Sequence, residues 1–338
     1  MATLYVQEQG TRLGVRQERL IVRRGAEEIL AVPVIKVDRV VIMGRGVQVS
    51  TSALVFLARR GIPLVFTSRA GRGYPVSVQG WTLRNGERLL AQVDLVRNPA
   101  RALPLVQAIV QGKVANQMAL LRAWGPIWGG ADGPALGVMA RAYTATAGAR
   151  DADQARGYEG AGAAAYWGAW RAVFAAGWGF DGRKYHPAPD PLNALLSFGY
   201  TLLLNEILAA VQIVGLDLSL GFFHVVEAGR PSLALDIEEE FRALLVDDLV
   251  LRLLQERVIT PADFQPAAEQ AGAIHLTDAA RVGFIRAYET RLDTKVPYPY
   301  LPQPATETWH RCVLLQVQQI ARVIEGRQAA YQALPWPG

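Results

Sequence analysis

Three side chains that lie far apart in the sequence could together bind a divalent metal ion: Glu159, His224 and Glu239. Two carboxylate groups and one imidazole nitrogen suit a hard cation such as Mg²⁺ or Mn²⁺. Zinc usually takes more nitrogen or sulfur ligands, and the iron facial triad takes two histidines. The pattern therefore predicts phosphate chemistry at a metal site, provided that the fold brings the three residues together.

Glu159 lies in an Arg-Gly-Tyr-Glu-Gly run near the start of a predicted helix. A lone glutamate in that position is usually a surface residue that compensates the helix dipole. However, small residues recur every four positions at Gly160, Ala164 and Gly168, and we expect them to let another backbone approach closely. Such a face would partly bury Glu159, and a desolvated carboxylate favours a cation or a hydrogen-bond donor beside it.

His224 follows an apolar segment, where a lone histidine is usually a hydrogen-bonded core residue. The next residues favour a site, because Gly229-Arg230-Pro231 turns the chain and Ser232 can cap a helix. The apolar stripe of this helix comprises Leu233, Ile237, Phe241 and Leu244. The carboxylates of Asp236, Glu239 and Glu240 share a neighbouring face, where they would repel unless a cation or a basic partner compensates. The alternative is a solvated acidic first turn.

Composition favours a folded protein with a polyanionic partner. The chain has 338 residues, of which 51% are hydrophobic and 19% charged, so it can bury a large core and is long enough for two domains. The formal net charge is +5, and arginine greatly outnumbers lysine. Guanidinium groups bind phosphates bidentately, although an arginine-rich proteome would give the same bias.

The remaining composition signals favour a cytoplasmic protein. Cys312 is the only cysteine, so neither an intrachain disulfide nor a cysteine metal cluster can form. The N-terminal residues lack the basic and then apolar pattern of a signal peptide. The most apolar stretch runs from Pro191 toward Val226, but Glu206 and Asp217 interrupt it. We expect a buried pair of helices there rather than a membrane span.

The spacing of apolar residues changes near residues 80 to 87. Before this point, short runs rich in valine and isoleucine predict strands at 4–7, 13–16, 20–24, 29–34, 37–43 and 62–66. One helix is expected at 52–60, with Ser50 or Thr51 as its N-cap and Gly61 as its stop. Turn signals occur at 71–73 and at 85–86.

After Glu87 the spacing of apolar residues lengthens to three and four, which predicts several helices. The predicted fold class is therefore α+β. We expect a small β-rich N-terminal domain at residues 1–84 and a larger all-α catalytic domain at residues 85–338.

Four ordered motifs are similar to those of a known family. They are Arg156-Gly-Tyr-Glu159-Gly, then Asp190-Pro-Leu-Asn193-Ala-Leu-Leu-Ser-Phe-Gly-Tyr200, then Gly221-Phe-Phe-His224 leading to Gly229-Arg-Pro-Ser-Leu-Ala-Leu-Asp236-Ile-Glu-Glu239-Glu-Phe-Arg242, and more weakly Gly112-Lys113-Val-Ala-Asn116-Gln117. With these motifs, and over nearly its whole length, the chain resembles Cas1, the CRISPR-associated integrase and endonuclease family that captures new spacers. The resemblance implies the two-domain layout above and a homodimer formed largely through the N-terminal domain.

The resemblance also assigns roles to residues of this chain. The family's metal-binding glutamate, histidine and acidic residue correspond to Glu159, His224 and Glu239, and the last of these is aspartate in some members. Asp236 matches a second acidic position, either orienting a ligand or binding a second metal ion. The implied cofactor is Mg²⁺ or Mn²⁺. The implied partners are double-stranded DNA, as prespacer and CRISPR repeat, and a dimer of the companion protein Cas2.

The reaction that the resemblance implies is strand transfer, in which the 3′-hydroxyl of a DNA fragment attacks a phosphodiester at the edge of a CRISPR repeat. If water replaces the hydroxyl, the same site becomes a nuclease. Candidates for DNA contacts are Arg183, Lys184, Asn193 and Arg230, since donors beside a metal can hold the phosphate backbone. A surface salt bridge is the alternative role for each charged member.

Other classes of function stay open at this point. A stand-alone metal-dependent DNA nuclease or resolvase would use the same ligands without a partner protein. A catalytically silent DNA-binding or scaffolding protein is a further alternative, although the complete ligand set argues against it. A phosphohydrolase acting on small nucleotides lacks support, since no Walker or His-Asp motif stands out.

Overall fold

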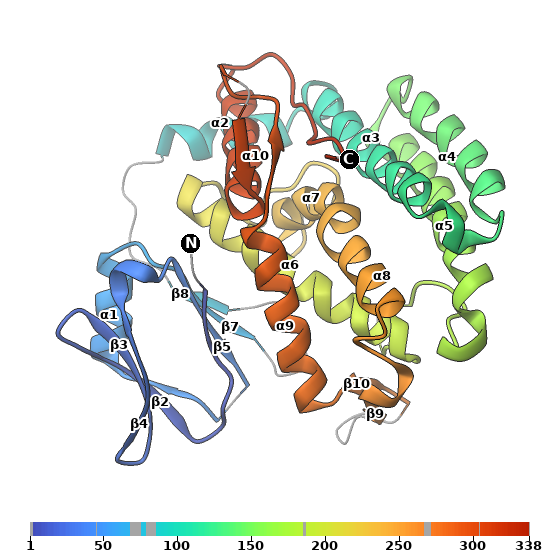
Figure 1. The fold of residues 1–338 in the computed structure, drawn as a ribbon. Helices are drawn as coiled ribbons and strands as arrows, with labels where there is room; N and C mark the ends of the chain where they lie inside the picture. The colour runs from blue at the N-terminus through green and yellow to red at the C-terminus, as the bar shows by residue number, and fades with distance from the viewer. Residues whose placement is uncertain are drawn as a thin grey trace.

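The computed structural model describes residues 3–44, 46–67, 76–78, 86–184, 187–266, 272–303 and 305–337. Strands predominate up to residue 78 and helices from residue 86 onward (Figure 1). This order confirms the predicted fold class, with a strand-rich N-terminal part and a mostly helical remainder. The turn predicted at 71–73, Asn85 of the second turn and the domain boundary predicted between 84 and 85 lie outside the described residues.

The N-terminal part contains two four-stranded sheets. One has the order β1-β5-β7-β8, and its members are β1 (Thr3–Val6), β5 (Arg39–Met43), β7 (Leu64–Thr67) and β8 (Val76–Val78). The other has the order β4-β3-β2-β6, and its members are β4 (Glu27–Pro33), β3 (Arg19–Arg24), β2 (Thr11–Arg16) and β6 (Gln48–Val49). All six predicted strands are present, whereas β6 and β8 are too short to give a periodic pattern.

Helix α1 (Thr51–Arg59) also matches its prediction. The side chain of Ser50 accepts a hydrogen bond from the backbone N–H of Ala53, so Ser50 is the N-cap. Gly61, with a φ of 65°, follows the end of the helix, where the left-handed conformation suits glycine.

Strand β5 joins the two hydrophobic cores of the molecule, because it is buried along its whole length. Val40 and Ile42 pack within the N-terminal core, whereas Val41 and Met43 belong to the core of the helical part. This division follows from the alternation of side chains along a strand. β5 pairs in parallel with β1 and β7, as is typical of a strand that is covered on both faces.

The helical part is built mainly from long helices. Its helices are α2 (Gly86–Val96), α3 (Pro99–Ala123), α4 (Asp132–Ala147), α5 (Ala152–Trp178), α6 (Pro191–Val214), α7 (Ser232–Phe241), α8 (Asp248–Gln255), α9 (Asp278–Asp293) and α10 (Trp309–Ile324), with a π-helical segment η3 (Arg242–Asp247) between α7 and α8. This part is not all helix, because it also contains the hairpins β9–β10 (Phe264–Pro266 and Ile274–Leu276) and β11–β12 (Lys295–Tyr298 and Ala305–Thr308). Strands of three or four residues give little sequence signal.

The apolar stretch from Pro191 forms one helix and not the expected helix pair. Helix α6 ends at Val214 because Gly215 adopts a φ of 79°, and the segment 215–231 contains no regular helix. By length and composition α6 could cross a membrane, but 89% of its most apolar window is buried inside the protein. It is the central core helix of the structure, and α7 and α10 pack against it (Figure 1).

Candidate metal centre

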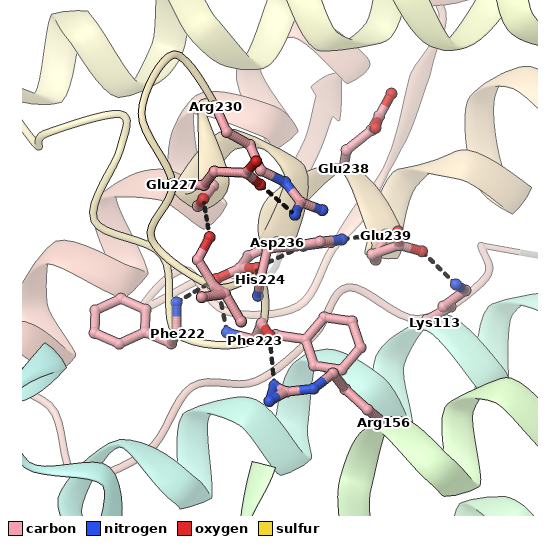
Figure 2. Close-up of polar contacts among 12 residues, drawn as sticks. Lys113, Arg156, Phe222, Phe223, His224, Glu227, Arg230, Asp236, Glu238 and Glu239 are labelled. Atoms are coloured by element: carbon pink, nitrogen blue, oxygen red, sulfur yellow. Dashed lines mark hydrogen bonds and ion pairs between the residues drawn. The ribbon is translucent and has the colours of Figure 1, made fainter. Parts of the chain in front are cut away.

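The three predicted ligands lie near one another, and one lysine contacts two of them. Glu159 comes from α5, Glu239 from α7, His224 from the segment 215–231, and Lys113 from α3. Lys113 forms an ion pair with Glu159, and its Nζ atom lies 2.5 Å from Oε2 of Glu239. Nε2 of His224 lies 4.0 Å from Oε1 of Glu239. Figure 2 shows Lys113 pointing toward Glu239 on the side away from Asp236.

Asp236 fixes both the backbone and the ring of His224. Its Oδ2 atom accepts hydrogen bonds from the backbone N–H of Phe222 at 2.6 Å and of Phe223 at 3.0 Å. Its Oδ1 atom accepts from the backbone N–H of His224 at 2.7 Å and lies 2.8 Å from Nδ1 of the ring. Asp236 is completely buried, and these four contacts hold the histidine loop (residues 215–231) against α7 (Figure 2).

The contact with Asp236 also sets the tautomer of His224. An ionised carboxylate can only accept hydrogen bonds, so Nδ1 of the ring must carry the proton that is donated to Asp236. In the neutral ring, Nε2 then carries the free lone pair, and this atom faces Glu239. The arrangement is the one expected of a histidine that is prepared to bind a metal ion through Nε2.

Close backbone packing holds the histidine loop in place. A Cβ atom added to Gly221 would lie 2.7 Å from the backbone carbon of Ser232, so only glycine fits there. Arg156, one turn before Glu159 on α5, donates from Nη1 to the carbonyl oxygen of Phe223 at 3.0 Å. The prediction that Ser232 caps α7 is wrong, since its hydroxyl donates to the carbonyl oxygen of Val225 at 2.7 Å.

The carboxylates of α7 are buried, which excludes a solvated acidic turn. Glu239 is 4% exposed and Glu240 is 1% exposed. Arg242 donates to Oε1 of Glu239 at 2.6 Å and to Glu238 at 2.8 Å. Glu240 instead accepts from Gln316 at 2.8 Å and from the backbone N–H of Leu334 at 2.9 Å. Glu239 and Glu240 therefore have separate partners, as expected for carboxylates that must avoid mutual repulsion.

The cationic neighbours keep Glu239 ionised. Burial alone would raise the pKa of Glu239, but the nearby charges, above all those of Arg242 and Lys113, outweigh burial and lower this pKa to about 2. Burial likewise disfavours the ammonium of Lys113, yet Glu239 and Glu159 raise the pKa of Lys113 above its ordinary value. The site therefore contains buried carboxylates whose negative charges are met by basic side chains.

The donor set fits a hard divalent cation. Within the part of the chain that the structure describes, no three His, Cys, Asp or Glu side chains lie close enough to share a metal ion in this conformation. The ammonium of Lys113 lies between two of the predicted ligands. Oε2 of Glu239 is buried, and the ammonium of Lys113 lies 2.5 Å from it. Two carboxylates and an imidazole nitrogen with a free lone pair are oxygen-rich donors of the kind that a hard cation takes, so the residues fit Mg²⁺ or Mn²⁺.

Glu159 is partly buried as predicted, with 18% of its side chain exposed, but not for the predicted reason. Gly160 and Gly168 are exposed, and a Cβ atom added to either would meet no atom within 4 Å. The close approach on α5 occurs instead at Gly162, where an added Cβ atom would lie 3.5 Å from Val114 of α3. The spacing of the small residues was read correctly from the sequence, but it did not predict which face of α5 packs against another helix.

The candidate DNA contacts are placed differently from one another. Asn193 is completely buried, and its side chain bonds Arg183, the backbone N–H of Lys184 and Asp190. The prediction of a direct DNA contact by Asn193 therefore does not fit, because its amide is already used inside the protein. Asn193 instead fixes the loop that carries Arg183 and the exposed Lys184. Arg230 is 30% exposed and lies beside Glu227 in the turn before α7 (Figure 2).

A buried aspartate ties together the elements that carry the site. Asp247, at the end of η3, accepts hydrogen bonds from Tyr166 of α5 at 2.7 Å and from Tyr200 of α6 at 2.6 Å. The guanidinium of Arg242 lies 4.8 Å from the ring centre of Tyr200, and that of Arg183 lies 5.2 Å from it. Asp247 therefore links the helix of Glu159 to the helix of Glu239. A π-helical segment is frequent at functional sites.

Sequence reasoning missed the roles of Lys113, Arg242 and Asp247. Lys113 stands in an otherwise uncharged stretch of α3, and a lone lysine there is a signal for a buried ion pair. Arg242 follows Glu238 and Glu239 at helical spacing, which predicts ion pairs on one face. Asp247 gave no signal, because its two tyrosine partners lie on distant segments.

Comparison with known proteins places this arrangement in a family. The family model described as CRISPR associated protein Cas1 matches residues 4–290. The chain belongs to the Cas1 family. CRISPR-associated endonuclease Cas1 2 of Rhodospirillum rubrum is 37% identical to it, over 99% of this chain and 97% of the relative. CRISPR-associated endonuclease Cas1 1 of Thermus thermophilus is 34% identical, over 96% of each chain.

Solved structures share the fold of this Cas1 family member. A Cas1 protein from Thermotoga maritima superposes with a TM-score of 0.80 at 21% identity, over 98% of this chain and 100% of that one. A casposase bound to an integration product gives a TM-score of 0.84 at 21% identity, over 98% and 93% of the two chains. At such identities these two comparisons establish the fold alone.

Proposed function

We propose that this Cas1 family member is a DNA integrase and endonuclease that inserts new spacer DNA into a CRISPR array. Its curated relatives are named CRISPR-associated endonucleases, and one protein of similar fold is a casposase bound to an integration product. Integration and cutting share one chemistry, since a 3′-hydroxyl or a water molecule attacks a phosphodiester in each case.

The observation that carries this proposal is that Glu239 lies beside His224 and is joined to Glu159 through Lys113. The three residues come from segments that are far apart in the sequence, and each is at least partly buried. Side chains of this chemistry are rarely buried together unless a cation is held there. The second predicted class, a silent scaffold, would not need to retain such a set.

The mechanism assigns a role to each side chain. Glu159, His224 and Glu239 would hold Mg²⁺ or Mn²⁺, which when bound would polarise the phosphoryl oxygen and help to deprotonate the attacking hydroxyl. Asp236 holds His224 in the tautomer with a free Nε2 lone pair. Both oxygens of Asp236 already accept hydrogen bonds, so we assign it a positioning role and not that of a second metal ligand.

The same proposal covers the nucleic acid and protein partners. Lys184 and Arg230 would contact the DNA backbone of prespacer and repeat, and Arg183 and Asn193 would hold the loop of Lys184. A solved structure of similar fold is a Cas6-RT-Cas1–Cas2 complex. We accordingly propose a homodimer that assembles with a Cas2 dimer on double-stranded DNA in the cytoplasm. We also propose that each chain has two domains, at residues 1–84 and 85–338.

A half-site integration assay tests the proposed site. A labelled DNA fragment and a repeat-bearing plasmid are incubated with Mn²⁺ and the intact protein, Glu159→Gln or His224→Ala. We expect each variant to lower strand transfer and plasmid nicking by at least about 100-fold. The matched control Glu256→Gln changes an exposed glutamate outside the site and is expected to keep both activities. Full activity of Glu159→Gln or His224→Ala would refute the assignment.

The companion protein separates the two enzymatic alternatives. An integrase should give full-site products only when Cas2 is added, because two distant strand transfers must be coordinated. A stand-alone nuclease or resolvase would cut DNA equally well with and without Cas2 and would yield no integration product.

A further inference from the structure

Lys113 lies where a metal ion would meet two of its ligands. It is 7% exposed as a residue, and its ammonium is ion-paired with both Glu159 and Glu239. Glu239 has a second cationic partner in Arg242. Glu159 has no second ion-pair partner among the described residues. Lys113 is therefore the residue that joins the charges of α3, α5 and α7.

We infer that Lys113 is a built-in counter-cation that occupies the metal centre of the metal-free protein and must be displaced when a divalent ion binds. The inference rests on the proposed function, because it takes Glu159, His224 and Glu239 as the metal ligands. It adds a role in which Lys113 sets the metal affinity of the site. The protein would thus keep its carboxylates ionised and in place without metal, at the expense of weaker binding.

The ammonium of Lys113 and a divalent ion would compete for the same two carboxylates. Lys113 contacts Oε1 of Glu159 and Oε2 of Glu239. A divalent ion shared by these carboxylates would draw on the same negative charge and would repel the ammonium at short range. The ammonium must therefore leave at least one carboxylate before the ion is fully bound.

The two basic residues of the site differ in how easily they can move. Arg242 is held by Glu238 and Glu239, and its guanidinium packs over the ring of Tyr200 at 4.8 Å. Lys113 has a compact charge on a flexible stem and only the two glutamates as ion-pair partners in the described part of the chain. Lys113 can leave while Arg242 stays and keeps Glu239 oriented.

Calorimetric titration with Mn²⁺ tests the inference on the full-length protein. In Lys113→Met the competing charge is absent and the stem is conserved, so we expect Mn²⁺ to bind at least about tenfold more tightly than to the intact protein. The matched control Lys295→Met removes an exposed lysine of β11 and should leave the dissociation constant unchanged. An unchanged or weaker affinity of Lys113→Met would overturn the inference.

Thermal melting gives a second readout that does not depend on catalysis. Without metal, Lys113→Met removes the ion-pair partner of Glu159 and leaves the buried Glu239 with Arg242 alone, so we expect its Tm to fall by roughly 5 °C. Mn²⁺ should restore more stability to this variant than to the intact protein. Equal increases in Tm on addition of Mn²⁺ would contradict a displacement of Lys113.

A labelling experiment on the intact protein covers the case in which Lys113→Met does not fold. Lysines are acylated briefly with an N-hydroxysuccinimide ester, and each site is quantified by mass spectrometry with and without Mn²⁺. We expect acylation of Lys113 to rise severalfold with Mn²⁺, while that of Lys295 stays constant. No rise at Lys113 would overturn the inference.

The outcomes separate this inference from the proposed function. If Mn²⁺ binds the intact protein and Glu159→Gln abolishes binding, the metal centre stands, and Lys113→Met alone decides the role of the lysine. If Mn²⁺ binds with the same affinity to the intact protein and to Glu159→Gln, the metal centre itself is refuted, and the role of Lys113 is refuted with it.

Discussion

Replacement of Asp247 by asparagine should flatten the pH dependence of stability. Asp247 is completely buried between Tyr166 and Tyr200. Burial raises the pKa of this carboxyl from 3.8 to about 6, even though the tyrosine hydrogen bonds and the charges of Arg242 and Arg183 act in the opposite direction. Asparagine has the same shape, and a tyrosine hydroxyl can rotate to accept a hydrogen bond from its amide.

The sign of the effect follows from proton linkage. A carboxyl whose pKa is raised in the folded state binds its proton more tightly there than in the unfolded chain. Its contribution to stability is therefore complete below pH 3.8 and is lost as the pH rises through about 6. A shift of about two pKa units corresponds to about 3 kcal/mol in total. About half of this, roughly 1.5 kcal/mol, is lost between about pH 5 and pH 7.5.

The assay is thermal melting of the intact protein, Asp247→Asn and the control Asp94→Asn over this pH range. Relative to the intact protein, the Tm of Asp247→Asn should rise by roughly 2 °C between about pH 5 and pH 7.5. Asp94 is exposed on α2, so its variant should follow the intact protein at every pH. Parallel curves for Asp247→Asn and the intact protein would show that Asp247 does not titrate in this range, and the reasoning from burial would fail.

Two further predictions concern the histidine loop. Gly221→Ala would place a methyl group against the backbone of Ser232, so it should destabilise the protein by about 1–3 kcal/mol and lower its Tm. The control Gly283→Ala lies on the open face of α9 and should leave the Tm unchanged. Equal Tm values for the two variants would contradict the close packing at Gly221. Asp236→Ala should weaken Mn²⁺ binding by about 10–100-fold in calorimetric titration, because His224 loses the partner that fixes its ring. Unchanged affinity would remove the positioning role of Asp236.

Much of the architecture follows from local sequence pattern. Alternating runs of valine and isoleucine predicted six strands, and Ser50 with Gly61 predicted the ends of α1. These features depend on side-chain period and on capping, which are properties of neighbouring residues. The hairpins β9–β10 and β11–β12 were missed, since such short strands carry no clear period and are stabilised by pairing.

The sequence by itself determined which chemistry was available: Glu159, His224 and Glu239 were named from residue type and motif alone. Only the tertiary structure decided what surrounds them. It places Lys113 between two of the carboxylates, leaves Gly160 and Gly168 exposed, and buries Asn193 inside the protein. The physical reason is that residue types and spacings are local, whereas ion pairs and burial depend on contacts between segments that are distant in the chain.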